Sequence, residues 1–277
     1  MFTRTTGLLI VPLWLAAMSW LIAHDVLPGW TALDPPALRV TDPMREDGGR
    51  VQFTLSSEDG PLGRIWTSYL VDEDSIRRDD LILIDRLPLH IAPLRIGLTS
   101  VFTGEGVLDE FTAVVENRET RLPIKLHGER FHADFSFTLQ TDAMTRAFKM
   151  PLVEGGLVSG AFNPFSPLAD LRVGQSWRMH VFNPIAALTG LGDRFIPVLV
   201  HVVGEGRIKT ADWEGNCLVL EAGSTRAWVD AEGAVRVQEM TLPMLGQLRI
   251  VRDARFDHQA YAAAKRVRLA FGRPDPT

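Results

Sequence analysis

FHADFSFTLQ, residues 131–140, decides the fold, because apolar and polar side chains alternate along it. Successive side chains of a β-strand point to opposite faces of the sheet, so this stretch predicts one strand with one face in a core and the other in water. Such a strand is typical of an antiparallel sheet. The apolar positions are Phe131, Ala133, Phe135, Phe137 and Leu139.

The same period of two recurs along the chain and predicts a mainly β domain over residues 48–255. Residues 225–240 indicate a hairpin, because Asp230-Ala-Glu-Gly233 supplies a side-chain acceptor and a glycine that tolerates a positive φ. Glycines and prolines interrupt the pattern at residues 155–171 and predict two sub-halves, about 48–154 and 165–255. The other strand-like runs are 50–56, 94–102, 177–181, 198–203, 217–220 and 247–251.

Residues 7–23, GLLIVPLWLAAMSWLIA, carry no charge and predict a single transmembrane anchor. Seventeen residues at the rise of an α-helix span about 25 Å, at the short end for a bilayer. Arg4 is the sole basic residue before this span and favours a cytoplasmic segment 1–6, with a proline-rich linker over residues 24–47. The alternative is a cleaved signal peptide, because Ala17-Met-Ser19 has the small-x-small spacing of a cleavage site.

Both alternatives place the β domain outside the cytoplasm. The expected location is the bacterial inner membrane, crossed once, with the C-terminal domain on the periplasmic side. At the other end of the chain, residues 256–271 space apolar side chains at helical intervals. We therefore expect an amphipathic helix within a C-terminal segment 256–277, packed so that it closes one end of the sheet. A shorter helix is predicted at residues 184–190.

Composition and motifs exclude several classes of function. The net charge of −5 and the absence of a long basic run remove the electrostatic basis for nucleic-acid binding. Cys217 is the only cysteine, so the chain can form neither an intramolecular disulfide nor a cysteine-based zinc site. The sequence contains no G-x-S-x-G, Walker loop or H-E-x-x-H motif. We therefore expect no cofactor and no enzymatic activity.

His132 and Asp134 are the strongest candidates for a metal site. On one continuous strand, residues i and i+2 share a face, so both side chains can reach one ion. That face is also the polar one, where such residues occur without any function. The acidic stretch from Asp72 to Asp80 lacks the glycine and the final glutamate of an EF-hand, and is interpreted as a solvated loop.

Four large aromatic residues are candidates for binding an apolar ligand: Trp66, Phe135, Phe137 and Trp177. Taken singly, each of these side chains is interpreted as part of the core of a β domain. A strongly curved sheet can instead hold an apolar groove that takes lipid chains or apolar peptides. The sequence leaves both interpretations open.

The second half resembles uncharacterised bacterial exported domains. Those domains start a strand at a motif like Leu171-Arg-Val-Gly174-Gln-Ser-Trp177 and end with a hairpin like Trp228-Val-Asp-Ala-Glu-Gly233. They are similar in fold to the half-barrels of the lipoprotein-localisation carriers, whose curved sheet binds acyl chains. The resemblance covers about residues 165–252 and implies a large, curved, half-barrel-like sheet with an apolar ligand. It implies no catalytic residue.

Three functional hypotheses follow. The first is a membrane-anchored envelope protein whose β domain binds a lipid, a lipoprotein-like ligand or a client chain. The second is a scaffold subunit of a membrane protein complex, docking through a sheet edge or the C-terminal helix. The third is an envelope hydrolase or metal-dependent enzyme built around His132 and Asp134.

Overall fold

The computed structural model describes most of the β domain. The described residues are 49–86, 93–104, 106–117, 123–132, 134–151, 157–160, 168, 170–182, 195–242 and 246–266, with residues 18 and 36 singly. Except for these two residues, the expected anchor at 7–23 and its flanking segments lie outside them, as do the helix expected at 184–190 and the tail beyond residue 266. Across the described residues, no helix has both the length and the apolar character needed to cross a membrane.

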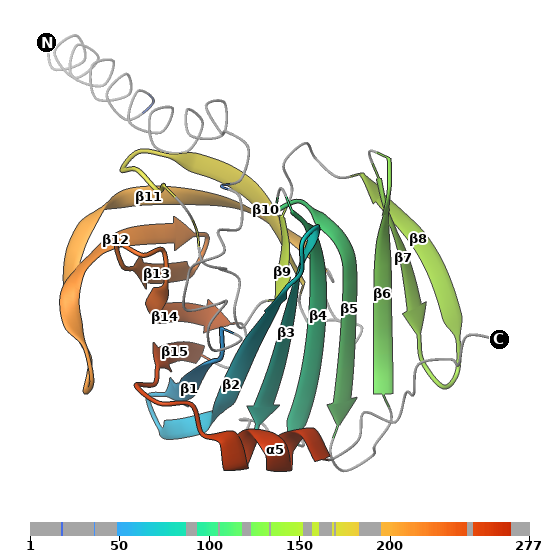
Figure 1. Ribbon diagram of the computed structural model, residues 1–277, viewed down its shortest axis with the longest axis horizontal. Helices are drawn as coiled ribbons and strands as arrows, with labels where there is room; N and C mark the ends of the chain where they lie inside the picture. The colour runs from blue at the N-terminus through green and yellow to red at the C-terminus, as the bar shows by residue number, and fades with distance from the viewer. Residues whose placement is uncertain are drawn as a thin grey trace, which may run out of the picture.

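In the part of the chain that the structure describes, fifteen strands form one continuous sheet, which confirms the mainly β prediction (Figure 1). The spatial order is β8-β7-β6-β5-β4-β3-β2-β1-β15-β14-β13-β12-β11-β10-β9. All neighbours are antiparallel except β9 and β10. The strands are β1 (Val51–Ser57), β2 (Gly60–Val71), β3 (Ser75–Ile84), β4 (Leu94–Thr103), β5 (Leu108–Asn117), β6 (Pro123–Phe131), β7 (Asp134–Gln140), β8 (Thr145–Pro151), β9 (Leu157–Gly160), β10 (Ser176–Phe182), β11 (Phe195–Lys209), β12 (Glu214–Ala222), β13 (Thr225–Val229), β14 (Val235–Leu242) and β15 (Gly246–Arg252).

The sheet consists of two meanders, β1–β8 and β10–β15, joined where β1 pairs with β15. It curls until β9 contacts β5, so that one face is turned inward (Figure 1). One hydrophobic core covers this inner face and draws on both meanders, with Leu55, Ile82, Val202 and Ile250 among its buried residues. The inner face therefore behaves as a single packing surface, and its burial is the main stabilising contribution to the fold.

Residues 131–140 are not one strand, so that prediction is wrong. Phe131 ends β6 and pairs with Asp134, the first residue of β7, and His132 between them has a φ of 55°. Residues paired across a two-residue turn share a face, so the alternation shifts by one residue at this turn, and Phe131 shares the face of Asp134 and not that of Phe135 and Phe137. Because Phe131 is apolar although it lies on the polar face, the pattern of β7 continues in the sequence across the turn and conceals it. Phe131 consequently lies at the end of a hairpin, 60% exposed.

The stretch from Asp72 to Asp80 is also not a solvated loop throughout. Residues from Ser75 onward belong to β3, and Arg78 and Asp80 are buried on its inner face, 3% and 6% exposed. The run of charged residues was predicted to be exposed, but these two side chains can be buried because they form an ion pair: Arg78 Nε lies 2.8 Å from Asp80 Oδ2.

The predicted C-terminal helix is confirmed as α5 (His258–Arg266), but its position differs from the expectation. It packs against the outer face of β2 and β3 through Ala264, Trp66 and Leu81, rather than closing an end of the sheet. The reason is a shared apolar patch: Trp66 and Leu81 project from the face opposite the main core, and the helix buries them.

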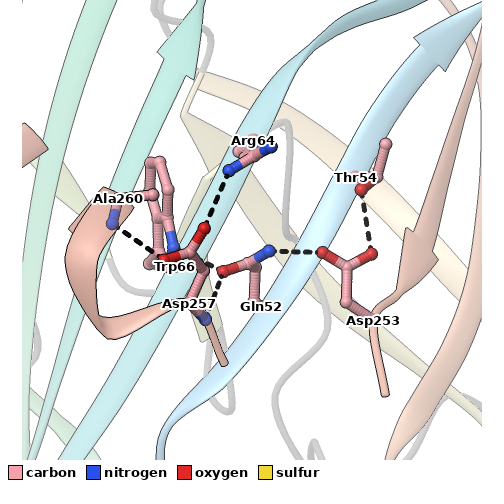
Figure 2. A network of polar contacts seen from close by, with 7 residues as sticks. All are labelled: Gln52, Thr54, Arg64, Trp66, Asp253, Asp257 and Ala260. Carbon is pink, nitrogen blue, oxygen red and sulfur yellow. Dashed lines mark hydrogen bonds and ion pairs between the residues drawn. The ribbon is translucent and has the colours of Figure 1, made fainter. Parts of the chain in front are cut away.

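Polar contacts secure the segment that leads into α5 (Figure 2). Gln52 is central: its Oε1 accepts from the indole of Trp66 at 2.7 Å and from the backbone N–H of Asp257 at 3.0 Å. Its Nε2 donates to Asp253 at 2.6 Å, and Asp257 caps the helix by accepting from the Ala260 N–H at 2.9 Å. These bonds satisfy the buried polar atoms beneath the helix.

Candidate functional site

The structure places three of the four aromatic candidates in the main core and one elsewhere. Phe135, Phe137 and Trp177 point from β7 and β10 to the inner face, and each is at most 1% exposed. Trp66 lies on the outer face beneath α5, with its ring centroid 6.3 Å from that of Tyr261. Trp66 therefore belongs to the helix contact and not to the inner face.

An aromatic cluster forms where the two arms of the curled sheet face each other. Phe137 on β7 lies at its centre, with ring centroids 5.1 Å from Phe135, 5.4 Å from Phe148 on β8 and 4.7 Å from Phe195 on β11. Phe148 and Phe195 are half-buried. We call this contact between β7–β8 and β11, made by these four rings, the seam.

A glycine in β6 makes room for the cluster. A Cβ at Gly128 would lie 2.5 Å from the Phe137 ring and 2.9 Å from the Phe135 ring. Neither Gly128 nor Phe195 was among the residues predicted from the sequence. A glycine within a strand is a recognised sign of close approach by another group, so Gly128 carried a usable signal. Phe195 carried no such signal in the sequence, because its contact with Phe137 joins residues far apart in the chain.

Charged and polar groups occupy another part of the inner face. Asp80 accepts hydrogen bonds from Thr67 Oγ1 at 2.5 Å and Arg78 Nη2 at 3.2 Å, in addition to its ion pair with Arg78 Nε. Burial alone would lower the pKa of Arg78, but the charge and hydrogen bond of Asp80, together with the neighbouring Tyr69, outweigh burial and raise this pKa above its ordinary value. Burial also raises the pKa of the neighbouring Tyr69 from 10.0 to about 12, so its hydroxyl stays protonated.

The hairpin named in the resemblance has a structural role. Asp230 accepts hydrogen bonds from the N–H groups of Glu232 and Ala234, at 3.0 and 2.8 Å, and Arg236 Nε donates to it at 2.6 Å. Gly233 has a φ of 81°, and a Cβ there would lie 2.2 Å from the carbonyl oxygen of Leu168. These residues shape a turn and its contact with Leu168, and they do not converge on a reacting group.

The geometry expected of His132 and Asp134 is absent. His132 lies in the β6–β7 turn and Asp134 begins β7, so the two residues do not alternate along one strand. Within the described part of the chain, no group of three or more His, Cys, Asp and Glu side chains could hold a metal ion. The basis for pairing these two residues is therefore wrong.

Comparisons with known proteins add the following. No family model and no curated protein matches the sequence. Among solved structures, a DUF1089 family protein from Pseudomonas aeruginosa is similar at 16% identity and a TM-score of 0.39, over 62% of this chain and 86% of that one. A β-barrel-like protein of the domain of unknown function DUF1849 from Brucella abortus has 9% identity and a TM-score of 0.38, over 74% and 95%. At these TM-scores the likeness carries no functional information, and neither protein is described as a lipoprotein-localisation carrier.

Proposed function

We propose that the protein is a non-enzymatic, membrane-anchored envelope protein whose β domain binds an apolar ligand, a lipid chain or an apolar client segment, on its inner face. The charge-free stretch at residues 7–23 supports an anchor in the bacterial inner membrane, with the domain on the periplasmic side. The domain then receives its ligand close to the bilayer that anchors it.

The observation that carries this proposal is an apolar inner face that backbone hydrogen bonds do not close. The end strands β8 and β9 are not paired with each other in the described sheet. The described side-chain contact between β7–β8 and β11 is instead made by aromatic rings. Ring contacts are non-directional, so the acyl chain of a ligand can replace them at little cost, whereas a paired strand would have to break hydrogen bonds.

A second candidate function is a scaffold subunit of a membrane protein complex. The edge strand β8 favours it, because β8 pairs only with β7 among the described strands and offers its other edge to a strand of a partner. This hypothesis predicts that a membrane partner co-purifies with the full chain and that the inner face takes no apolar ligand.

Binding of 1-dodecanol to the full chain in lipid nanodiscs tests the proposal, with protein-free nanodiscs as the blank. The variant Phe148→Asp places a charge at the seam, while Phe131→Asp places the same charge on a phenylalanine that is 60% exposed at the β6–β7 turn. Removing a large apolar contact costs about 1.5–3 kcal/mol, so we expect Phe148→Asp to weaken binding by about tenfold or more and Phe131→Asp to leave it unchanged. Equal affinities in the two variants, or no binding by the unmodified chain, would refute the proposal.

A further inference from the structure

Arg252 is a cation on the inner face without a bonding partner. It ends β15 and shares a face with Leu248 and Ile250, both in the main core. Its side chain is half-buried, and its guanidinium makes no hydrogen bond or ion pair with any other described residue. Burial, with the nearby charge of Arg236, lowers the pKa of Arg252 below its ordinary value. A half-buried guanidinium with no partner is costly, which makes it a candidate for binding an anion.

The neighbouring strand supplies a second unpaired donor. Gln238 on β14 pairs with Ile250 on β15, two residues before Arg252, so Gln238 and Arg252 are diagonal neighbours. Gln238 is 1% exposed, and its buried Nε2 has no hydrogen-bond partner within the described chain. Buried amide groups are nearly always satisfied, so an unpaired Nε2 indicates that a hydrogen-bond acceptor is missing here.

The nearby buried carboxylates already have ion-pair and hydrogen-bond partners. Asp230 is bound to Arg236 and to two backbone N–H groups, and Asp80 is bound to Arg78 and Thr67. Glu232, the remaining acidic group that influences Arg252, is exposed. The two buried pairs cancel, which leaves Arg252 as one uncompensated positive charge. The site therefore matches a ligand with a single negative charge.

We propose that Arg252 and Gln238 bind the carboxylate head group of an acyl chain whose tail lies along the inner face. A guanidinium suits a carboxylate because its parallel N–H groups match the two oxygens, and the amide adds a further donor. The strand register leads from this site across an apolar row of the main core: paired residues run from Arg252 through Phe53, Ile65, Ile82 and Ile96 to Val115. This inference rests on the proposed function and adds the charge of the ligand to it.

The test compares laurate with 1-dodecanol, which share the same chain and differ in the head group. Both are measured at pH 8 with the full chain in nanodiscs. We expect the unmodified protein to bind laurate at least tenfold more tightly than dodecanol. Arg252→Met should abolish this preference without weakening dodecanol binding. Arg249→Met is the matched control, because Arg249 lies on the same strand but is exposed on the outer face near Glu239, and it should keep the preference.

Gln238→Leu provides an independent variant, because it removes the unpaired amide and keeps Arg252. It should reduce the preference for laurate several-fold. Equal affinity of the unmodified protein for laurate and dodecanol would overturn the carboxylate site and leave the proposed function standing. A preference retained in Arg252→Met would overturn the site as well. Failure of both probes to bind would overturn the site together with the proposed function.

Discussion

Asp80 and Asp79 are adjacent on β3, and each forms an ion pair with the arginine two residues before it. The side chains of Arg78 and Asp80 are 4% and 5% exposed, and they lie on the inner face. The side chains of Arg77 and Asp79 are 48% and 39% exposed, and they lie on the outer face. The two pairs thus share strand, spacing and residue types, and they differ in burial.

Replacing Asp80 by alanine leaves the guanidinium of Arg78 buried without its counter-ion, which costs about 3–5 kcal/mol of the free energy of unfolding. It also removes the acceptor of the Thr67 hydroxyl. Asp79→Ala removes an exposed ion pair and a hydrogen bond from Thr99, so it should lower the free energy of unfolding by about 1 kcal/mol. In urea, with a slope of about 2–3 kcal/mol per molar, Asp80→Ala should lower the midpoint by roughly 1–2 M.

The double variant Arg78→Met with Asp80→Leu separates the two contributions. Replacing a buried ion pair by apolar side chains is often close to neutral, so the double variant should recover most of the stability lost in Asp80→Ala. Equal costs for Asp80→Ala and Asp79→Ala, or a double variant less stable than Asp80→Ala, would refute the reasoning that burial sets the strength of this pair.

Three further predictions concern a tyrosine, the cysteine and the helix contact. One of the two tyrosines should titrate near pH 12 by ultraviolet absorbance, and this step should disappear in Tyr69→Phe and remain in Tyr261→Phe. The free energy of unfolding should fall as the pH rises from 10 to 12, because the tyrosine of the unfolded chain loses its proton at a lower pH than Tyr69 of the folded chain. Burial raises the pKa of Cys217 from 9.0 to about 11, so the folded chain should not react with a thiol reagent at pH 8, whereas the urea-unfolded chain should react fully. Gln52→Leu should lower the free energy of unfolding by about 1–3 kcal/mol and speed amide hydrogen exchange in residues 258–266. Gln247→Leu, at an exposed position, should change neither the stability nor the exchange rate. Unchanged exchange in Gln52→Leu would contradict the contact in Figure 2.

Local chemistry made part of the fold predictable. The hairpin of β13 and β14 was predicted because Asp230 and Gly233 are residues that its turn requires. β3 was missed because a buried ion pair resembles a solvated charge run in sequence. The break between β6 and β7 was missed because Phe131 and Ala133 continue the apolar spacing of β7 in the sequence, although Phe131 lies on the opposite face of the sheet from Phe135 and Phe137.

The candidate sites were less predictable because they depend on contacts between distant parts of the chain. The aromatic interpretation of Phe135 and Phe137 identified the right strand, but their partner Phe195 comes from the opposite arm of the sheet. Arg252 became a candidate only once the register with β14 was known, because that register places the unpaired amide of Gln238 beside it. A sequence pattern shows which face a side chain occupies, but not which groups lie across from it.

The most direct test of the central claim is native mass spectrometry of the full chain purified from its expression host, before and after organic extraction. We expect one acyl-chain species to be bound per protein chain before extraction, to be retained in Phe131→Asp and to be lost in Phe148→Asp. A chain that carries no lipid in its unmodified form, with its fold intact, would contradict the claim that the inner face is a binding surface.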